Sequence, residues 1–158
     1  MVKSLQRNLD SISKLGSRAE DYSMRTANLC FFGMTLFFSV VYFIIASTEE
    51  VGKAAGDATI IKDNLTKYLI VVSATSLILV MMEFYPMMSR LMKLIRLICV
   101  LALVVFVGLS INSVIDLADK ANNDSSITLV YTFASLTLGF AGLASIVNIL
   151  EVARNSGY

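Results

Sequence analysis

Only a few residues of this chain could do chemistry, and an acidic residue followed by three basic ones stands out. Glu83 lies at the end of an apolar run, and Arg90, Lys93 and Arg96 follow it at helical spacing. A carboxylate in apolar surroundings is costly unless it is paired, so we expect Glu83 to pair with one of these cations. Pro86 lies between them and stops a helix, because its ring removes a backbone hydrogen bond. These five residues predict a structural clamp across a helical hairpin; the alternative is a role of Glu83 in ion or proton passage.

Other chemistry-bearing patterns are missing from the sequence. The chain has no His, no CxxC pair and no glycine-rich phosphate loop. Asp116, Asp119 and Asp124 form an acidic loop without the ligand number or the glycine of a calcium site. We therefore expect no enzymatic activity, no cofactor, no metal site and no small-molecule substrate. The net charge of +1 gives no field that would attract nucleic acid.

Four apolar stretches must position these residues, and each is long enough to cross a bilayer. They run over about 27–47, 68–88, 94–113 and 127–150. Hydrophobic residues make up 56% of the chain and charged residues only 16%, which is far from a soluble composition. The sequence predicts an all-α integral membrane protein, a four-helix bundle over residues 27–150, with an arm at 1–26 and a tail at 151–158.

The distribution of Lys and Arg predicts the orientation of this bundle. Nine of them fall in the N-terminal segment, the second connection and the C-terminal tail, and four in the first and third connections. Positive residues concentrate on the cytosolic side. Both termini are therefore expected to be cytosolic.

The N-terminal segment, residues 2–20, has the pattern of an amphipathic helix. Its apolar residues recur at helical spacing, and its basic residues cluster on the other side. The residues that define this arm are Lys3, Leu5, Arg7, Leu9, Ile12, Lys14 and Arg18. Gly16 is expected to weaken its last turn. Two occupants fit the apolar stripe: the lipid surface of the membrane, or a protein.

The fourth apolar stretch is rich in small residues. Ser135, Gly139, Gly142 and Ser145 give small-xxx-small spacings, which let helix backbones approach closely in a membrane. The sequence leaves open whether this contact lies within the bundle or with a second subunit.

The Glu83-x-x-Pro86 element and the short basic turn after it resemble the COPI-associated small Golgi membrane proteins. The resemblance implies four spans and an association with vesicle traffic in the Golgi. It implies no catalytic residue, and only Glu83 and Pro86 carry over, as structural positions. The chain departs from the family pattern because its third span is not glycine-rich after the turn.

These patterns favour a non-enzymatic membrane protein that acts as a scaffold or accessory subunit in an endomembrane, with lipids, other membrane proteins or itself as partners. The alternative is a homo-oligomeric channel whose pore is lined by Ser, Thr and Asn.

Overall fold

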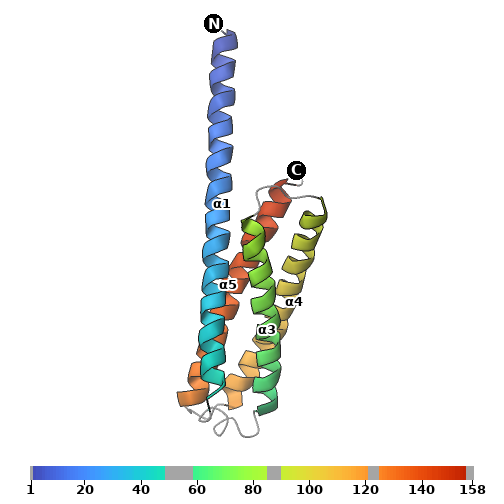
Figure 1. Ribbon diagram of the computed structural model, residues 1–158. Helices are drawn as coiled ribbons and strands as arrows, with labels where there is room; N and C mark the ends of the chain where they lie inside the picture. Colours follow the sequence, from blue (N-terminus) through green and yellow to red (C-terminus); the bar gives the residue numbers. More distant parts are fainter. Residues whose placement is uncertain (1, 49–58, 85–89, 121–124, 156–158) are drawn as a thin grey trace.

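The computed structural model describes residues 2–48, 59–84, 90–120 and 125–155, and the described chain is helical apart from short turns at helix ends (Figure 1). The helices are α1 (Val2–Ala46), α3 (Thr59–Glu83), α4 (Arg90–Lys120) and α5 (Ser125–Asn155). Each contains a stretch long and apolar enough to cross a membrane. The all-helical prediction is confirmed.

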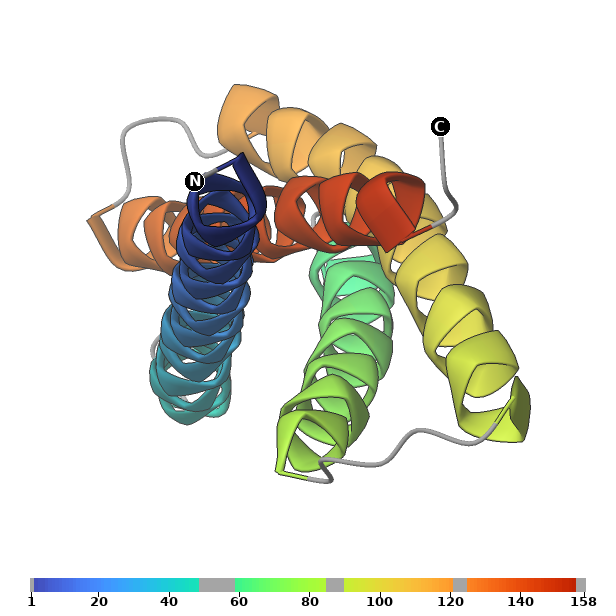
Figure 2. The same ribbon diagram turned by 90° about the horizontal axis from the view of Figure 1, so that it is seen from above.

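Consecutive helices run in opposite directions and lie side by side, so the described fold is an up-and-down bundle. Helix α1 packs chiefly against α5 and α3, and α4 packs against the same two helices. Seen from above, α3 and α5 separate α1 from α4 (Figure 2). The end of α3, the start of α4 and the end of α5 share one end of the bundle with the middle of α1 (Figure 1).

The outer surface of this bundle is largely apolar. Large hydrophobic side chains point outward from all four helices, among them Phe37 on α1, Met81 on α3, Leu101 on α4 and Ile146 on α5. A helix that is apolar on every side belongs in lipid or in the core of a large protein. The four apolar helices therefore fit a transmembrane bundle.

A seven-residue repeat runs along the buried side of every helix. Successive core residues are spaced by three and four positions, and all are buried except Val107, Val114 and Glu151, which are half-buried. On α1 and α3 they are Asn28, Phe32, Thr35, Ser39, Tyr42 and Ala46, then Leu65, Leu69, Val72, Ser76, Leu79 and Glu83. On α4 and α5 they are Arg96, Val100, Leu103, Val107, Ser110, Val114 and Leu117, then Ile127, Val130, Ala134, Thr137, Ala141, Ala144, Asn148 and Glu151.

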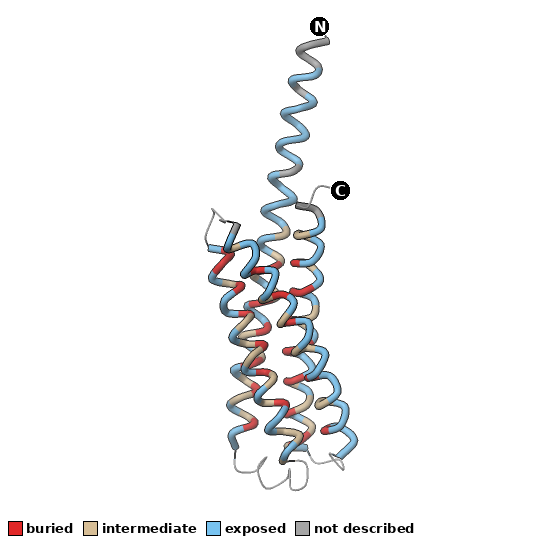
Figure 3. The backbone as a smooth tube through the Cα atoms, turned by 90° about the vertical axis from the view of Figure 1, so that its right-hand side faces the viewer, coloured by how far each residue is buried: buried red, intermediate tan, exposed pale blue. Residues whose placement is uncertain are grey.

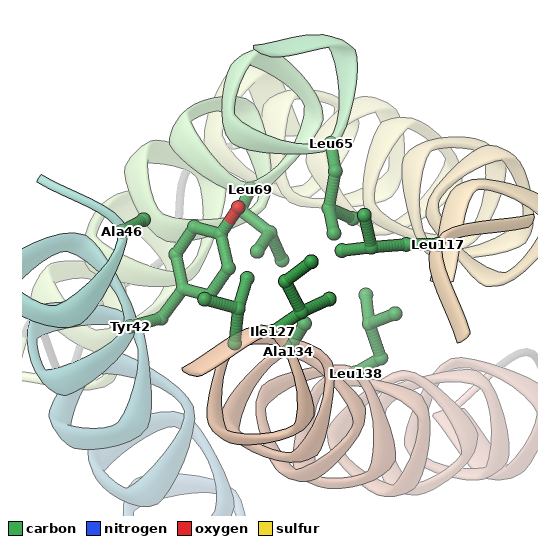
Figure 4. Packing of buried hydrophobic residues seen from close by; sticks show 9 residues of the cluster. Tyr42, Ala46, Leu65, Leu69, Leu117, Ile127, Ala134 and Leu138 are labelled. Atoms are coloured by element: carbon green, nitrogen blue, oxygen red, sulfur yellow. The ribbon is translucent and has the colours of Figure 1, made fainter. Parts of the chain in front are cut away.

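This spacing is the heptad pattern of helices that pack nearly parallel or antiparallel to one another. The apolar members form two clusters along the bundle. In one cluster, Tyr42 points between Leu69 and Ile127 (Figure 4). The hydroxyl of Tyr42 lies 3.0 Å from Thr66 Oγ1. Because Thr66 donates its own proton to the Lys62 carbonyl, Tyr42 is the donor in this link between α1 and α3.

Helix α1 continues far beyond the bundle without a break (Figure 3). The segment predicted as a separate amphipathic arm and the predicted first span form one helix of 45 residues, which passes through Gly16. The expected weakening at Gly16 is therefore not visible in the backbone.

The second predicted span differs from its helix at the C-terminal end. Helix α3 ends at Glu83, and Phe84 N donates to Met81 O in a closing turn. The interval 85–88, which the prediction included in the span, lies outside the described residues.

Candidate functional site: a buried polar layer

Arg96 is the centre of a polar layer at the end of the bundle where α3 ends. Its side chain is only 10% exposed, although it is a permanent cation. Nη2 of Arg96 donates to Glu83 Oε1 at 2.8 Å and to Glu151 Oε2 at 2.7 Å. The guanidinium also donates to Asn148 Oδ1, from Nη2 at 2.6 Å and from Nε at 3.0 Å. One cation of α4 therefore holds side chains of both α3 and α5.

Asn28 of α1 closes the layer from the opposite side. Its amide nitrogen donates to Glu151 Oε2 at 3.1 Å and, at the longer distance of 3.4 Å, to Glu83 Oε1. Its amide oxygen accepts from Asn148 Nδ2 at 3.1 Å. Asn28 and Asn148 are both fully buried. The two carboxylates, on α3 and α5, thus each lie between a group of α1 and a group of α4.

Arg25 supplies the second cation of the layer, one turn of α1 before Asn28. Its guanidinium donates to the backbone carbonyl of Glu83, and its Nε lies 3.9 Å from Glu83 Oε2. With Arg25 and Arg96 against Glu83 and Glu151, the formal charges of the layer cancel. Arg25 is about half exposed, so it belongs to the rim of the layer.

The layer joins all four helices through charge-assisted hydrogen bonds. Such bonds are stronger than neutral ones, and they are stronger still away from water. The donors and acceptors of the layer bind one another. This geometry suits a structural contact between helices more than it suits catalysis on a substrate. Among the described residues, no group of acidic, Cys or His side chains is arranged to hold a metal ion.

Of the residues predicted to form the hairpin clamp, the structure brings together Glu83 and Arg96. Lys93 is exposed on α4 and contributes to none of the contacts of the layer described above. Pro86 lies outside the described residues, and so does the side chain of Arg90, whose backbone begins α4. Of the two candidate cations whose side chains are described, the more distant one pairs with Glu83, because Arg96 is buried whereas Lys93 is exposed.

Sequence reasoning did not identify Arg25, Asn28, Asn148 and Glu151 as partners of this pair. Asn28, Asn148 and Glu151 lie on the heptad repeats of α1 and α5, and Arg25 continues the repeat of α1 by one step. A polar residue at a heptad core position is a signal of a specific interhelical contact. This signal was available in the sequence once the repeat was recognised.

The small residues of the fourth stretch divide between two sides of α5. Ser145 is buried, Gly142 is half-buried, and Ser135 and Gly139 are exposed. A Cβ added at Gly139 would meet nothing within 4 Å. Ser135 and Gly139 therefore lie outside the core of the bundle, which corrects the alternative that placed the whole motif within it. The small residues that pack inside, besides Ser145, are Ala134, Thr137, Ala141 and Ala144.

The residues of the predicted arm lie on the projecting part of α1. Arg7, Leu9, Ile12, Lys14 and Arg18 are all exposed. The side chains of Lys3 and Leu5 lie outside the described residues, although their backbone is helical.

Comparison with known proteins finds no protein family, curated protein or solved structure that matches this chain. Its function must therefore be argued from its own geometry.

Replacing Glu83 tests the polar layer directly. We expect Glu83→Ala to destabilise the bundle more than Glu83→Gln, because the amide keeps an acceptor for Arg96 while alanine leaves that guanidinium short of one partner. The expected losses are about 3 kcal/mol for Ala and about 1 kcal/mol for Gln. Thermal unfolding in detergent, followed by circular dichroism, measures both. Equal melting of both variants and wild type would show that Glu83 does not hold the layer.

Proposed function

We propose that this chain is a non-enzymatic membrane protein, a scaffold or accessory subunit that presents a cytosolic helix to other proteins. The observation that supports this most is the single helix α1, which is fixed in the bundle at one end and projects freely at the other. The proposed compartment is the Golgi or its transport vesicles, on the strength of the Glu83-x-x-Pro86 element alone.

The proposed orientation places the polar layer and the projecting part of α1 on the cytosolic side. The excess of Lys and Arg around both termini and the second connection supports it. The layer then lies near the membrane surface, where charged side chains cost less than at the centre of the bilayer.

The polar layer anchors the projecting helix α1 to its neighbouring helices. Arg25 and Asn28 belong to α1 and bind Glu83 and Glu151 on its two neighbours. These contacts lie where α1 leaves the bundle, since the described side chains of α1 before Met24 are exposed whereas Asn28 is buried. A helix held at this point keeps the direction in which it presents its surface.

The projecting helix carries its basic residues on one side. Counted back from Asn28 in steps of three and four, the core repeat of α1 continues through Arg25, Asp21, Arg18, Lys14, Ser11 and Arg7, so that four of these six positions are basic and one is acidic. Arg7 and Arg18 are exposed, and both lie on the side of α1 that faces the bundle axis. An acidic segment of another protein is the kind of partner that this charge pattern attracts.

Purification of the tagged full-length chain from its native membrane in a mild detergent tests the proposed function. We expect stoichiometric foreign subunits, and we expect the double variant Arg7→Glu, Arg18→Glu to retain about tenfold less of them, since reversing two charges opposes an acidic partner. The control is Lys67→Glu, Lys120→Glu, which reverses two exposed charges at the other end of the bundle. A homo-oligomer without foreign subunits that conducts ions in a bilayer would contradict the proposal and support the channel.

A further inference from the structure

Helix α1 carries a second heptad repeat on the side that faces away from the bundle. We call it the outer seam. All of its members are exposed, both along the bundle and beyond it. They are Leu9, Ile12, Gly16, Ala19, Ser23, Thr26, Cys30, Gly33, Phe37, Val40 and Ile44.

The part of the outer seam beyond the bundle carries no charged residue, although the other sides of the same helical segment do. Between Leu9 and Arg25 the helix has three acidic and two basic residues, and none of them falls on the seam. Leu9 is 61% exposed and Ile12 is 66% exposed. A free helix surface in water has no reason to keep a continuous uncharged stripe with exposed Leu and Ile side chains, so this stripe indicates a partner.

The central part of the outer seam consists of small residues only. Six successive members, from Gly16 to Gly33, are Gly, Ala, Ser, Thr or Cys. A Cβ added at Gly16 or Gly33 would meet nothing within 4 Å, so the bundle itself does not require glycine at either position. Small residues let a second helix backbone approach closely, whereas lipid tails have no such need.

We propose that the outer seam binds the outer seam of a second copy of this chain, in a parallel two-helix contact that continues from the membrane into the cytosol. A two-fold axis places each seam residue opposite its own counterpart. A second copy therefore offers small residues and apolar residues at matching heights along the whole length. The contact goes beyond the proposed function, because the purified chain alone is sufficient to form it.

The length of the seam meets the requirement of a stable contact. From Leu9 to Ile44 it covers five heptads, more than the three to four over which a coiled-coil pattern becomes convincing. A strip about 53 Å long and about 10 Å wide on each helix gives a buried area on the order of 1,000 Å² in total. This buried area reaches the lower end of the range found for specific protein interfaces.

The charges of α1 are compatible with this contact. Positions that flank the seam carry Leu15 and Tyr22, and Glu20 is the only charged residue among those directly beside it before Arg25. Arg7, Lys14 and Arg18 lie on the opposite side, so two copies would not bring their cations together. In a helix lying flat on the membrane, by contrast, basic residues beside the stripe would reach the headgroups.

Disulfide cross-linking of the purified full-length chain in liposomes tests the proposal. Cys30 lies on the outer seam, so oxidation with copper phenanthroline should link two chains in the Cys99→Ser variant. Adding Cys30→Ser should abolish the dimer band, and adding Ser23→Cys to that chain should restore it. The matched control is Ser11→Cys in the same background, since Ser11 is an equally exposed serine on the other side of the helix.

A strong dimer band from the Cys30 and Ser23→Cys chains, at least about tenfold above the Ser11→Cys chain, is the expected result. Equal cross-linking of all three would indicate random collision and overturn the proposal. Failure of both seam cysteines to cross-link, together with a single bleaching step per particle in single-molecule photobleaching, would overturn it as well. Neither result depends on foreign subunits, so failure here is distinguishable from failure of the proposed function.

Discussion

Replacing Arg96 by Met is expected to cost the bundle about 3–5 kcal/mol, the largest loss of any single substitution considered for this chain. Met fills a similar volume but leaves Glu83 and Glu151 without their shared cation. Asn148 Oδ1 loses both of its bonds from Arg96 as well. Two neighbouring carboxylates would then remain in a poorly solvated place, where their charges repel each other. Thermal unfolding of the purified variant in detergent measures the loss.

Two further variants separate this effect from a loss of positive charge in general. Lys93→Met removes an exposed cation of the same helix and should change the melting temperature little. Arg96→Lys keeps the charge but cannot reach three acceptors from one planar group, so an intermediate loss is expected. If Arg96→Met melted like Lys93→Met, the polar layer would not stabilise the bundle.

Replacing Ala141 by Leu is expected to destabilise the bundle by about 1–3 kcal/mol, whereas Gly139→Leu should leave it unchanged. Ala141 is fully buried where α5 packs against its neighbours, and the added methyl groups have no space there. Gly139 is exposed, and a side chain at this position points away from the bundle. Unfolding of both variants, measured under the same conditions, gives the comparison.

The two substitutions differ in kind as well as in position, so Ala141→Ser serves as a conservative control. Serine is close to alanine in volume, and its hydroxyl can bond the carbonyl of the preceding turn, as Ser145 bonds Ala141 O. This variant should melt near wild type. A larger loss for Gly139→Leu than for Ala141→Leu would show that α5 is rotated relative to the arrangement described.

The sequence predicted the number and type of elements well, since stretches of about 20 apolar residues leave few alternatives in a bilayer. It also predicted that Glu83 pairs with one of three cations, and Arg96 is among them. Burial of a lone carboxylate is so unfavourable that a nearby cation could be expected. The remaining members of the layer, Asn28, Asn148 and Glu151, lie 55 or more residues from Glu83 along the chain, so that only the packing of the four helices brings them together.

The rotation of each helix was harder to predict for a physical reason. In a soluble bundle the apolar stripe marks the core, but here the exposed side is apolar as well, as Ile146 on α5 illustrates. The prediction for α5 therefore chose Ser135 and Gly139, which are exposed, although Ala134 and Thr137 beside them are buried. Small size alone does not separate the two sides of such a helix. Asn148, a buried amide on the same side as Ala134 and Ala141, does.

The regular heptads of this bundle would allow its helices to slide. A shift of one helix by seven residues, about 10 Å, would replace apolar core residues by others of similar kind. The parts of the core made of Leu, Val and Ala would tolerate such a shift. A shift of α4, however, would move Arg96 away from Glu83, Asn148 and Glu151, and these polar groups would then face apolar side chains. The polar layer thus fixes the register of the four helices, and with it how far α1 projects from the bundle. Replacing the whole layer by apolar residues would keep a stable bundle but lose this fixed register.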